Sequence, residues 1–424
     1  VLGGCSTINA MVYMRGQKED YDHWASLGNA GWSWDDVLPL FRQHEDFFAG
    51  ANEFHGAGGE LRVEEPRVRW EILDAWREAA EECGIPKIDE FNRGDNFGNA
   101  YFHMNQKRGV RWSATNAWLR PALSRPNLTV ATKAHATKVR FEQKDGRRRA
   151  TGLDYTVEGQ GAQSATARKA VILVAGSIGT PQLLQLSGVG PGPLLSQFGI
   201  PVFHEMAGVG EDLHDHLQIR MVFKVSNTTT LNTRVNSLLG KAAMGLEYLL
   251  FKTGPLTMPP SQLGAFAKSD PAQPTPNIEW HVQPLSLDKF GDPLHPFPAI
   301  TPSVCNLRPT SRGWVRIAST DPLAHPEIRL NYLSTDEDRK VAADGMRYTR
   351  RIMASPALSR FSPEEWRPGP GAQSDEALAK AAGDLGTTIF HPVSTCRMGR
   401  DGKAVVDERL RVRGIEGLRV VDAS

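Results

Sequence analysis

The stretch from Ala170 to Pro181, Ala-Val-Ile-Leu-Val-Ala-Gly-Ser-Ile-Gly-Thr-Pro, is the strongest indicator of the fold. The unbroken apolar run from Ala170 to Ala175 is typical of a parallel strand buried on both faces. The glycine-containing turn that follows, with Pro181 near the first turn, predicts a helix over Gln182 to Leu186. A strand, a glycine turn and a helix N-terminus can present N–H groups to a phosphate or a carbonyl. They equally form ordinary strand–helix junctions of α/β folds, so this segment leaves both interpretations open.

Strands and helices are both predicted on either side of this segment. Val139–Glu142 and Thr151–Val157 flank the turn signal Lys144-Asp145-Gly146, which predicts a hairpin. Apolar residues at helical spacing predict a helix from Trp70 to Gly84. The other predicted elements are a helix capped by Ser33 and running through Phe41, helices at Asp336–Met353 and Asp375–Ala382, and strands at Leu128–Thr132, Asn277–Val282 and Trp314–Ala318.

Length and composition limit the class of protein. A chain of 424 residues is too long for one ordinary core, so two packed domains are expected. A hydrophobic fraction of 40%, a charged fraction of 23% and a net charge of +1 indicate a globular protein without a nucleic-acid partner. The four cysteines form no Cys-x-x-Cys pair, which favours a reduced interior. The nearest approach to a membrane span, Leu238–Phe251, is interrupted by Lys241 and Glu247.

The segment Thr387–Gly399 carries the candidate reactive residue, His391. This histidine follows an apolar pair and is fixed by Pro392, and a histidine can exchange a proton near neutral pH. A histidine packed before a proline is the alternative. If His391 is reactive, general acid–base chemistry is the expected role.

Three other patterns contain residue types that can carry chemistry. Gly3-Gly4, followed by small hydroxyl residues, would let backbone N–H groups approach a ligand, or would form a plain surface turn. Leu213-His214-Asp215-His216 suggests a metal, but a zinc site needs three or four converging ligands, so a structural loop is favoured. A hydrolase would need a Gly-x-Ser-x-Gly elbow, and Leu186-Ser187-Gly188 lacks its first glycine.

Taken together, five segments in order resemble the glucose–methanol–choline (GMC) oxidoreductases, flavoenzymes that oxidise alcohols. They are Leu2–Gly16, Gly176–Gly190, Gly208–His216, Leu307–Gly313 and the closing set from Phe390 to Ser424. The resemblance implies a mixed α/β (α+β) fold, with a Rossmann-like FAD-binding domain interleaved with an antiparallel-sheet substrate domain. The implied division is 1–217 mainly FAD-binding with cap elements at about 20–110, 218–385 mainly substrate-binding, and 386–424 returning to the FAD-binding domain with His391.

The resemblance also implies where FAD would lie. The flavin and pyrophosphate would be lined by Gly3, Gly4, Ser6, Asn9, Ala10, Met11 and Val12. A backbone group of Ala136 would meet the adenine, and Asp422 would lie by the pyrophosphate and ribityl chain. Some members attach FAD through a histidine of the first motif. Ile8 stands at that position, so non-covalent FAD is expected, and no metal.

The implied activity is oxidation of a primary alcohol to an aldehyde by hydride transfer to flavin N5, with His391 as general base. The sequence looks closer to bacterial choline and aliphatic alcohol dehydrogenases than to oxidases, which favours a non-oxygen acceptor such as a quinone. The alternatives are an oxidase using O₂ and a non-catalytic fragment of the same fold. A light-driven fatty-acid decarboxylase is less favoured, because Cys305 is more simply explained by packing.

Two departures from the family pattern lead to a further expectation. No Gly-x-Gly-x-x-Gly turn stands at a strand–helix junction, and no second histidine or asparagine follows the Asp422-Ala423-Ser424 segment. We therefore expect a fragment lacking both termini, with weakened FAD binding or activity. The expected location is cytoplasmic, and peripheral association with the inner membrane is left open.

Overall fold

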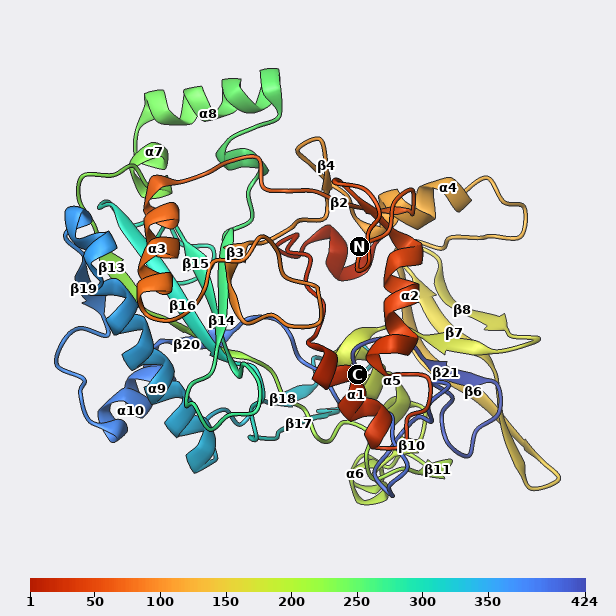
Figure 1. The fold of residues 1–424 in the computed structure, drawn as a ribbon. Coiled ribbons are helices and arrows are strands. Elements are labelled where there is room, and N and C mark those ends of the chain that lie inside the picture. The colour runs from red at the N-terminus through yellow and green to blue at the C-terminus, as the bar shows by residue number, and fades with distance from the viewer.

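The computed structural model of the protein describes residues 1–424 (Figure 1). One half of the molecule is built on a large antiparallel sheet with helices against it. The other half holds a short parallel strand pair, a helix that follows one of its strands, and a three-stranded antiparallel sheet. The predicted mixed α/β fold is confirmed.

The large sheet has eight strands. Its order is β19-β13-β16-β15-β14-β3, and β12 pairs with both β16 and β20. The strands are β3 (Gly98–Tyr101), β12 (Leu217–Arg220), β13 (Val222–Lys224), β14 (Leu263–Ala267), β15 (Ile278–Gln283), β16 (Ala299–Asn306), β19 (Glu364–Arg367) and β20 (Gly386–Thr388). The strand predicted at Asn277–Val282 is therefore confirmed, and it lies at the centre of the sheet.

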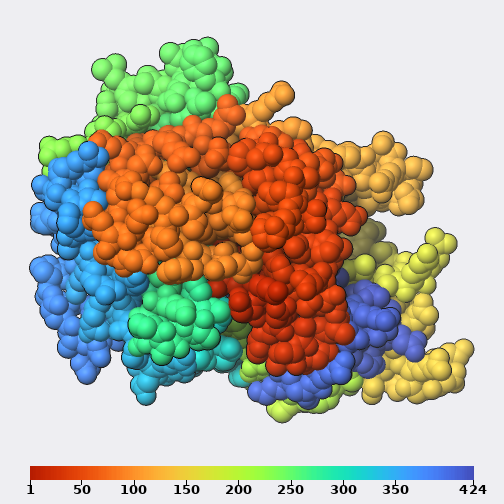
Figure 2. Space-filling view, viewed as in Figure 1, coloured from red at the N-terminus to blue at the C-terminus, as the bar shows by residue number.

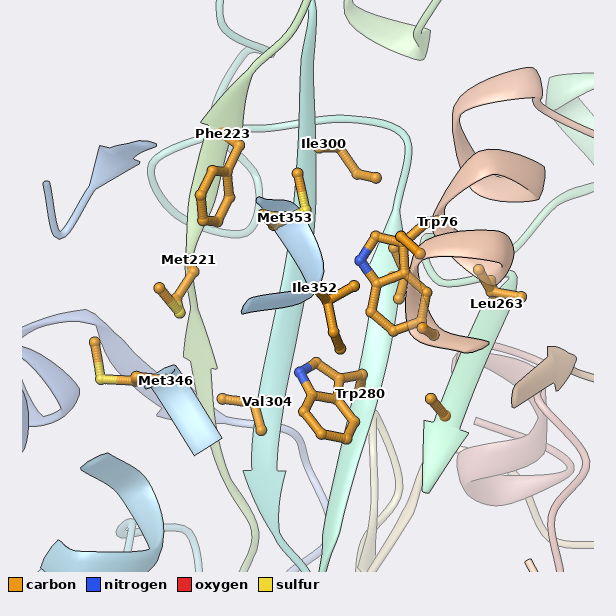
Figure 3. Close-up of a cluster of buried hydrophobic side chains, with 14 of the residues drawn as sticks. Trp76, Met221, Phe223, Leu263, Trp280, Ile300, Val304, Met346, Ile352 and Met353 are labelled. Carbon is orange, nitrogen blue, oxygen red and sulfur yellow. The ribbon is translucent and has the colours of Figure 1, made fainter. Parts of the chain in front are cut away.

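The two faces of this sheet differ in chemistry because side chains alternate along each strand. One face is apolar and packs under α3 (Glu71–Glu82) and α9 (Asp336–Met353), both of which were predicted. Figure 3 shows Trp280 and Val304 of the sheet close to Trp76 of α3 and Ile352 of α9. We call the opposite side the polar face; it carries Gln218, Arg220, Glu279, His281, Gln283, Ser303 and Cys305, all buried.

The second half contains the segment that indicated the fold. β9 (Val171–Leu173) pairs in parallel with β21 (Leu418–Val420), and α5 (Gly176–Leu186) follows β9. β6 (Ala134–Lys144), β7 (Arg147–Val157) and β8 (Gly161–Thr166) form the three-stranded sheet. The predicted hairpin is confirmed, and its turn places Asp145 and Gly146 at positive φ.

Two predicted features of this half are wrong. The run from Ala170 to Ala175 does form a parallel strand, as predicted, but the strand is only three residues long, and Ile172 is 56% exposed rather than buried because β21 is the one strand that pairs with β9. Residues 128–132 form no strand, since no neighbouring strand pairs with them and Lys133, at φ 54, redirects the chain before β6. β propensity alone cannot supply a missing partner.

The remaining elements are η1 (Gly4–Thr7), α1 (Lys18–Ser26), α2 (Trp34–His44), β1 (Glu45–Phe47), β2 (Leu61–Val63), β4 (Gln106–Lys107), β5 (Val110–Arg111), η2 (Thr115–Leu119), α4 (Arg120–Ala122), β10 (Val189–Gly190), α6 (Gly192–Gln197), β11 (His204–Glu205), α7 (Leu231–Val235), α8 (Leu238–Phe251), η3 (Pro255–Thr257), β17 (Trp314–Arg316), β18 (Glu327–Arg329), η4 (Pro356–Phe361) and α10 (Asp375–Leu385). The predicted Ser33 cap of α2 is confirmed, with Ser33 Oγ accepting from Asp36 N.

No helix has both the length and the apolar character to cross a bilayer. In Figure 2 the α8 region stands out from the body of the molecule at the top of the view.

Candidate active site

A buried carboxylate holds the loop that carries His391. The backbone N–H of His391 donates to Asp215 Oδ1 at 2.9 Å. Asp215 Oδ2 accepts from Tyr332 Oη and from Thr388 Oγ1, each at 2.5 Å. Asp215 is 2% exposed, so these three donors are what satisfy its charge within the protein. The sequence placed this aspartate in the segment Gly208–His216 and in a weak metal pattern, and the structure shows that its carboxylate anchors the loop of His391.

A second histidine fixes the orientation of His391. His216 Nδ1 lies 3.5 Å from His391 Nδ1, and His216 Nε2 lies 3.1 Å from the carbonyl oxygen of Leu307. A carbonyl only accepts, so we assign the His216 proton to Nε2. His216 Nδ1 then accepts from the Nδ1–H of His391. This chain leaves Nε2 of His391 with a free lone pair, which is the state a proton acceptor needs.

The surroundings keep His391 neutral. Although part of its imidazole is accessible, burial by neighbouring groups is the largest cause that lowers its pKa, to about 4. Positive charge on His216 or His281 lowers it further, while the carboxylates of Glu279 and Asp215 act in the opposite direction. At neutral pH the imidazole is therefore unprotonated and able to accept a proton.

A carboxylate–histidine contact on the polar face of the sheet lies within electrostatic reach of these histidines. Glu279 Oε1 is 3.1 Å from His281 Nε2, and both residues are buried on β15. Burial raises the pKa of Glu279, but the contact with His281 outweighs it and holds the pKa below its usual value. Periodicity predicted this strand, but it could not show that these two side chains face the site.

The loop after His391 is also tied to α5. Pro181 lies inside α5 and has no N–H to donate to the carbonyl of Ser177. Thr395 Oγ1 donates to that carbonyl instead, at 2.7 Å, and Ser177 Oγ donates to the carbonyl of Pro392. The proline thus leaves an acceptor in the helix that the active-site loop uses as an anchor.

The start of α5 corrects the prediction that this helix begins at Gln182. It begins at Gly176, because Asp422 Oδ2 accepts from Gly176 N at 2.8 Å and from Thr180 Oγ1 at 2.6 Å. The capping residue is distant in sequence, so no local signal could reveal this start. Asp422 therefore joins the end of the chain to the N-terminus of α5.

The first segment of the chain lies against β5 and η2. Ser6 Oγ accepts from Ala114 N at 2.9 Å, and Asn9 Oδ1 accepts from Arg111 Nη1 at 2.8 Å. Gly3 has φ 87, and a Cβ there would lie 2.5 Å from Thr115 Oγ1, so this position requires glycine. Gly4 has open space around it, and Ala10 is exposed.

The other predicted cofactor residues lie further from this turn. Met11 has φ 62 and its carbonyl accepts from Asn105 N, while Val12 forms a bridge with Met104. Ala136 pairs with Tyr155 in β6–β7, next to a shift of register. Such bulges often adjust backbone direction beside binding sites.

Comparison with known proteins identifies the fold family. Residues 1–218 and 309–424 match the N-terminal and C-terminal models described as GMC oxidoreductase. The chain belongs to the GMC oxidoreductase family. It is 37% identical to an alcohol dehydrogenase [acceptor] of Pseudomonas putida and 39% identical to an oxygen-dependent choline dehydrogenase of Serratia proteamaculans. Both matches cover 100% of this chain and 76% of the relative.

Solved structures of GMC-like fold agree with the architecture. An FAD-dependent oxidoreductase from Chaetomium thermophilum is 27% identical with a TM-score of 0.90, covering 100% of this chain and 81% of that one. A pyridoxine 4-oxidase from Mesorbium loti is 28% identical with a TM-score of 0.87, covering 99% and 78%. The resemblance inferred from the five segments is confirmed, and the chain is a GMC oxidoreductase.

Proposed function

We propose that this GMC oxidoreductase oxidises a primary alcohol to an aldehyde, using non-covalently bound FAD and a non-oxygen electron acceptor. The observation that carries the proposal is the placement of His391: Asp215 accepts from its backbone N–H, and His216 contacts its ring at Nδ1, which leaves Nε2 free to accept a proton. FAD, when bound, supplies the two-electron oxidant that accepts hydride from the carbinol carbon.

The residues present fit an FAD site. Thr115 Oγ1 is buried without a hydrogen-bond partner beside Gly3, and Ser424 Oγ is likewise unpaired near Asp422. Gly3, Gly4, Ser6, Asn9, Ala10, Met11 and Val12 would hold the flavin side, and Ala136 and Asp422 the adenine and pyrophosphate side. Ile8 is 73% exposed and has no nucleophile, which supports non-covalent binding.

In this proposal His391 removes the hydroxyl proton of the substrate. The proton moves from the alcohol oxygen to Nε2, and the oxygen gains the charge that makes the adjacent carbon a better hydride donor. The imidazolium so formed faces the carboxylates of Glu279 and Asp215, both of which favour its charge. Base assistance of this kind contributes about 10²–10⁴-fold to the rate.

The acceptor is the point on which the relatives differ. The Pseudomonas putida relative is an alcohol dehydrogenase [acceptor], while pyridoxine 4-oxidase shares the fold, so an oxidase using O₂ is the second candidate. We expect the purified protein to be yellow, to release FAD in acid, and to reduce a quinone-type dye faster than it consumes oxygen. A colourless protein would contradict the flavoenzyme proposal, and equal oxygen consumption would favour the oxidase.

The low pKa of His391 predicts an unusual pH dependence. Protonation of the free enzyme removes the base, so kcat/KM should stay level from neutral pH downwards and fall only near pH 4. A histidine with its ordinary pKa would lose activity near pH 6.5. Initial rates measured between pH 4 and 8, with stability checked at each pH, would distinguish the two. A break near pH 6.5 would contradict the environment described here.

Helix α8 is where we propose peripheral contact with a membrane. Its leucines are largely exposed, Leu249 by 71%, and only Met244 is buried. Glu247 lies 3.8 Å from Arg234, whereas Lys241 and Lys252 form no ion pair. An apolar helix face with unpaired lysines suits an anionic bilayer.

We expect the protein to sediment with vesicles containing anionic phospholipid, and L249E/L250E to reduce this binding by about tenfold. Leu323→Glu, at another exposed leucine, is the matched control and should bind like the wild type. Equal binding by the α8 variant would contradict the proposal. A second result would also contradict the proposal: light scattering shows that the wild type is a dimer and that the α8 variant is a monomer. Helix α8 would then be a subunit interface.

A further inference from the structure

The polar face of the large sheet carries a group of buried atoms without partners. Polar side chains alternate with core residues along β12, β15 and β16. Within the protein, hydrogen-bond partners are missing for Arg220 Nη1 and Nη2, Gln218 Oε1, Gln283 Oε1 and Ser303 Oγ. Buried polar groups are rarely left unpaired, so this many on one face of a sheet indicates a surface made for a polar ligand.

Arg220 is the charged member of this group. It is 6% exposed and lies opposite Ser303 in the pairing of β12 with β16. Its guanidinium stacks on the ring of Phe290 at 4.7 Å and forms no ion pair. Glu279, on the same face of the sheet, is engaged by His281, and Asp288, two residues before Phe290, is engaged by His295 and Arg367. Burial without a counter-charge also lowers the pKa of Arg220 to about 10.

The place of Arg220 relative to the candidate base limits what could bind it. Every second residue leading to the end of β12 is polar: His216, Gln218 and Arg220. The ring of His216 contacts the ring of His391. Arg220 is the last residue of β12 and His216 directly precedes that strand, so the four residue steps between their α-carbons span about 13 Å at the rise of an extended chain. Phe290 also packs 5.8 Å from Phe390, the residue before His391, which joins the two ends by an aromatic contact.

We propose that the alcohol oxidised by this protein carries a carboxylate at the end remote from its hydroxyl, and that Arg220 binds that carboxylate. This inference rests on the proposed function and specifies its substrate class. A planar guanidinium matches a carboxylate through two parallel hydrogen bonds, and a ligand anion would supply the missing counter-charge. Gln218 and Ser303 border the same surface. A cationic alcohol would meet an uncompensated positive charge there.

Three alcohols of equal length test the proposal: 6-hydroxyhexanoate, 1,6-hexanediol and 6-amino-1-hexanol. We expect kcat/KM to be highest for the hydroxy acid and lowest for the amine. Arg220→Gln should lower kcat/KM for the hydroxy acid by about 10–100-fold while changing the diol by about twofold or less. Arg220→Lys should retain part of the preference. Arg360→Gln, at an exposed arginine, is the matched control and should leave all three rates unchanged.

Binding of hexanoate, measured by calorimetry, tests the site without turnover. We expect hexanoate to bind the wild type and Arg360→Gln, and to lose at least about tenfold in affinity in Arg220→Gln. The melting temperature of Arg220→Gln should be equal or higher, since an unpaired buried charge is removed. If Arg220→Gln fails to fold, the comparison is made with Arg220→Lys.

The outcomes separate the two proposals. If no alcohol of any charge reduces the flavin, the proposed function fails, while loss of hexanoate binding in Arg220→Gln still supports the carboxylate site. If the alcohols are oxidised but hexanoate does not bind, the substrate inference is overturned. Equal effects of Arg220→Gln on the diol and the hydroxy acid would overturn it as well.

Discussion

Replacing His391 with asparagine is expected to slow anaerobic flavin reduction by a primary alcohol by about 10³-fold, while FAD stays bound. The side chain of asparagine can still form a hydrogen bond but cannot take the hydroxyl proton. The backbone N–H that donates to Asp215 is unchanged, so the loop should keep its position. Stopped-flow absorbance of the flavin band gives the rate, and the flavin-to-protein ratio gives occupancy.

His44→Asn is the matched control for this change. His44 is exposed at the end of α2 and its ring pairs with Glu60, away from the loop after β20. This variant should reduce its flavin at the wild-type rate. Wild-type kinetics in the His391 variant would move the base to another residue. A His391 variant without flavin would show a structural role instead.

Replacing Asp215 with alanine is expected to lower the free energy of unfolding by about 3–5 kcal/mol. We expect the same variant to have reduced activity. The change removes the acceptor for three donors at once: the His391 N–H and the hydroxyls of Tyr332 and Thr388. Because Asp215 is 2% exposed, water cannot readily replace it. Urea unfolding followed by fluorescence measures the loss in the free energy of unfolding.

Tyr332→Phe separates the stability effect from the effect on the site. It removes one hydroxyl donor and leaves the Asp215 carboxylate and the His391 contact in place. We expect a smaller loss of about 1–2 kcal/mol with flavin reduction largely retained. Equal stability of the Asp215→Ala variant and the wild type would contradict the anchoring role given to this carboxylate.

The sequence could predict the parts of the fold that depend on local pattern. The spacing of apolar residues is enough for α3 and α9, and the Lys144-Asp145-Gly146 turn is enough for the β6–β7 hairpin. His391 was singled out from its motif rather than from its neighbours, and its catalytic role stays a prediction. Family and fold class follow from five ordered segments that the comparisons confirm.

Features that depend on distant contacts could not be predicted. The start of α5 is set by Asp422, and the free carbonyl left by Pro181 is used by Thr395. Asp215 and His216 lie in a segment that the sequence assigned to a structural loop, and only the fold shows that they contact His391. The same is true of Arg220, because alternation along β12 becomes informative only once the core face is known.

The most direct test of the account is anaerobic mixing of the FAD-loaded protein with a primary alcohol and with the same alcohol deuterated at the carbinol carbon. We predict that the flavin band bleaches in a single turnover, that the deuterated alcohol reacts several-fold more slowly, and that an equivalent of aldehyde forms. A flavin that stays oxidised with every primary alcohol, including 6-hydroxyhexanoate, would contradict the proposed alcohol oxidation with His391 as the base.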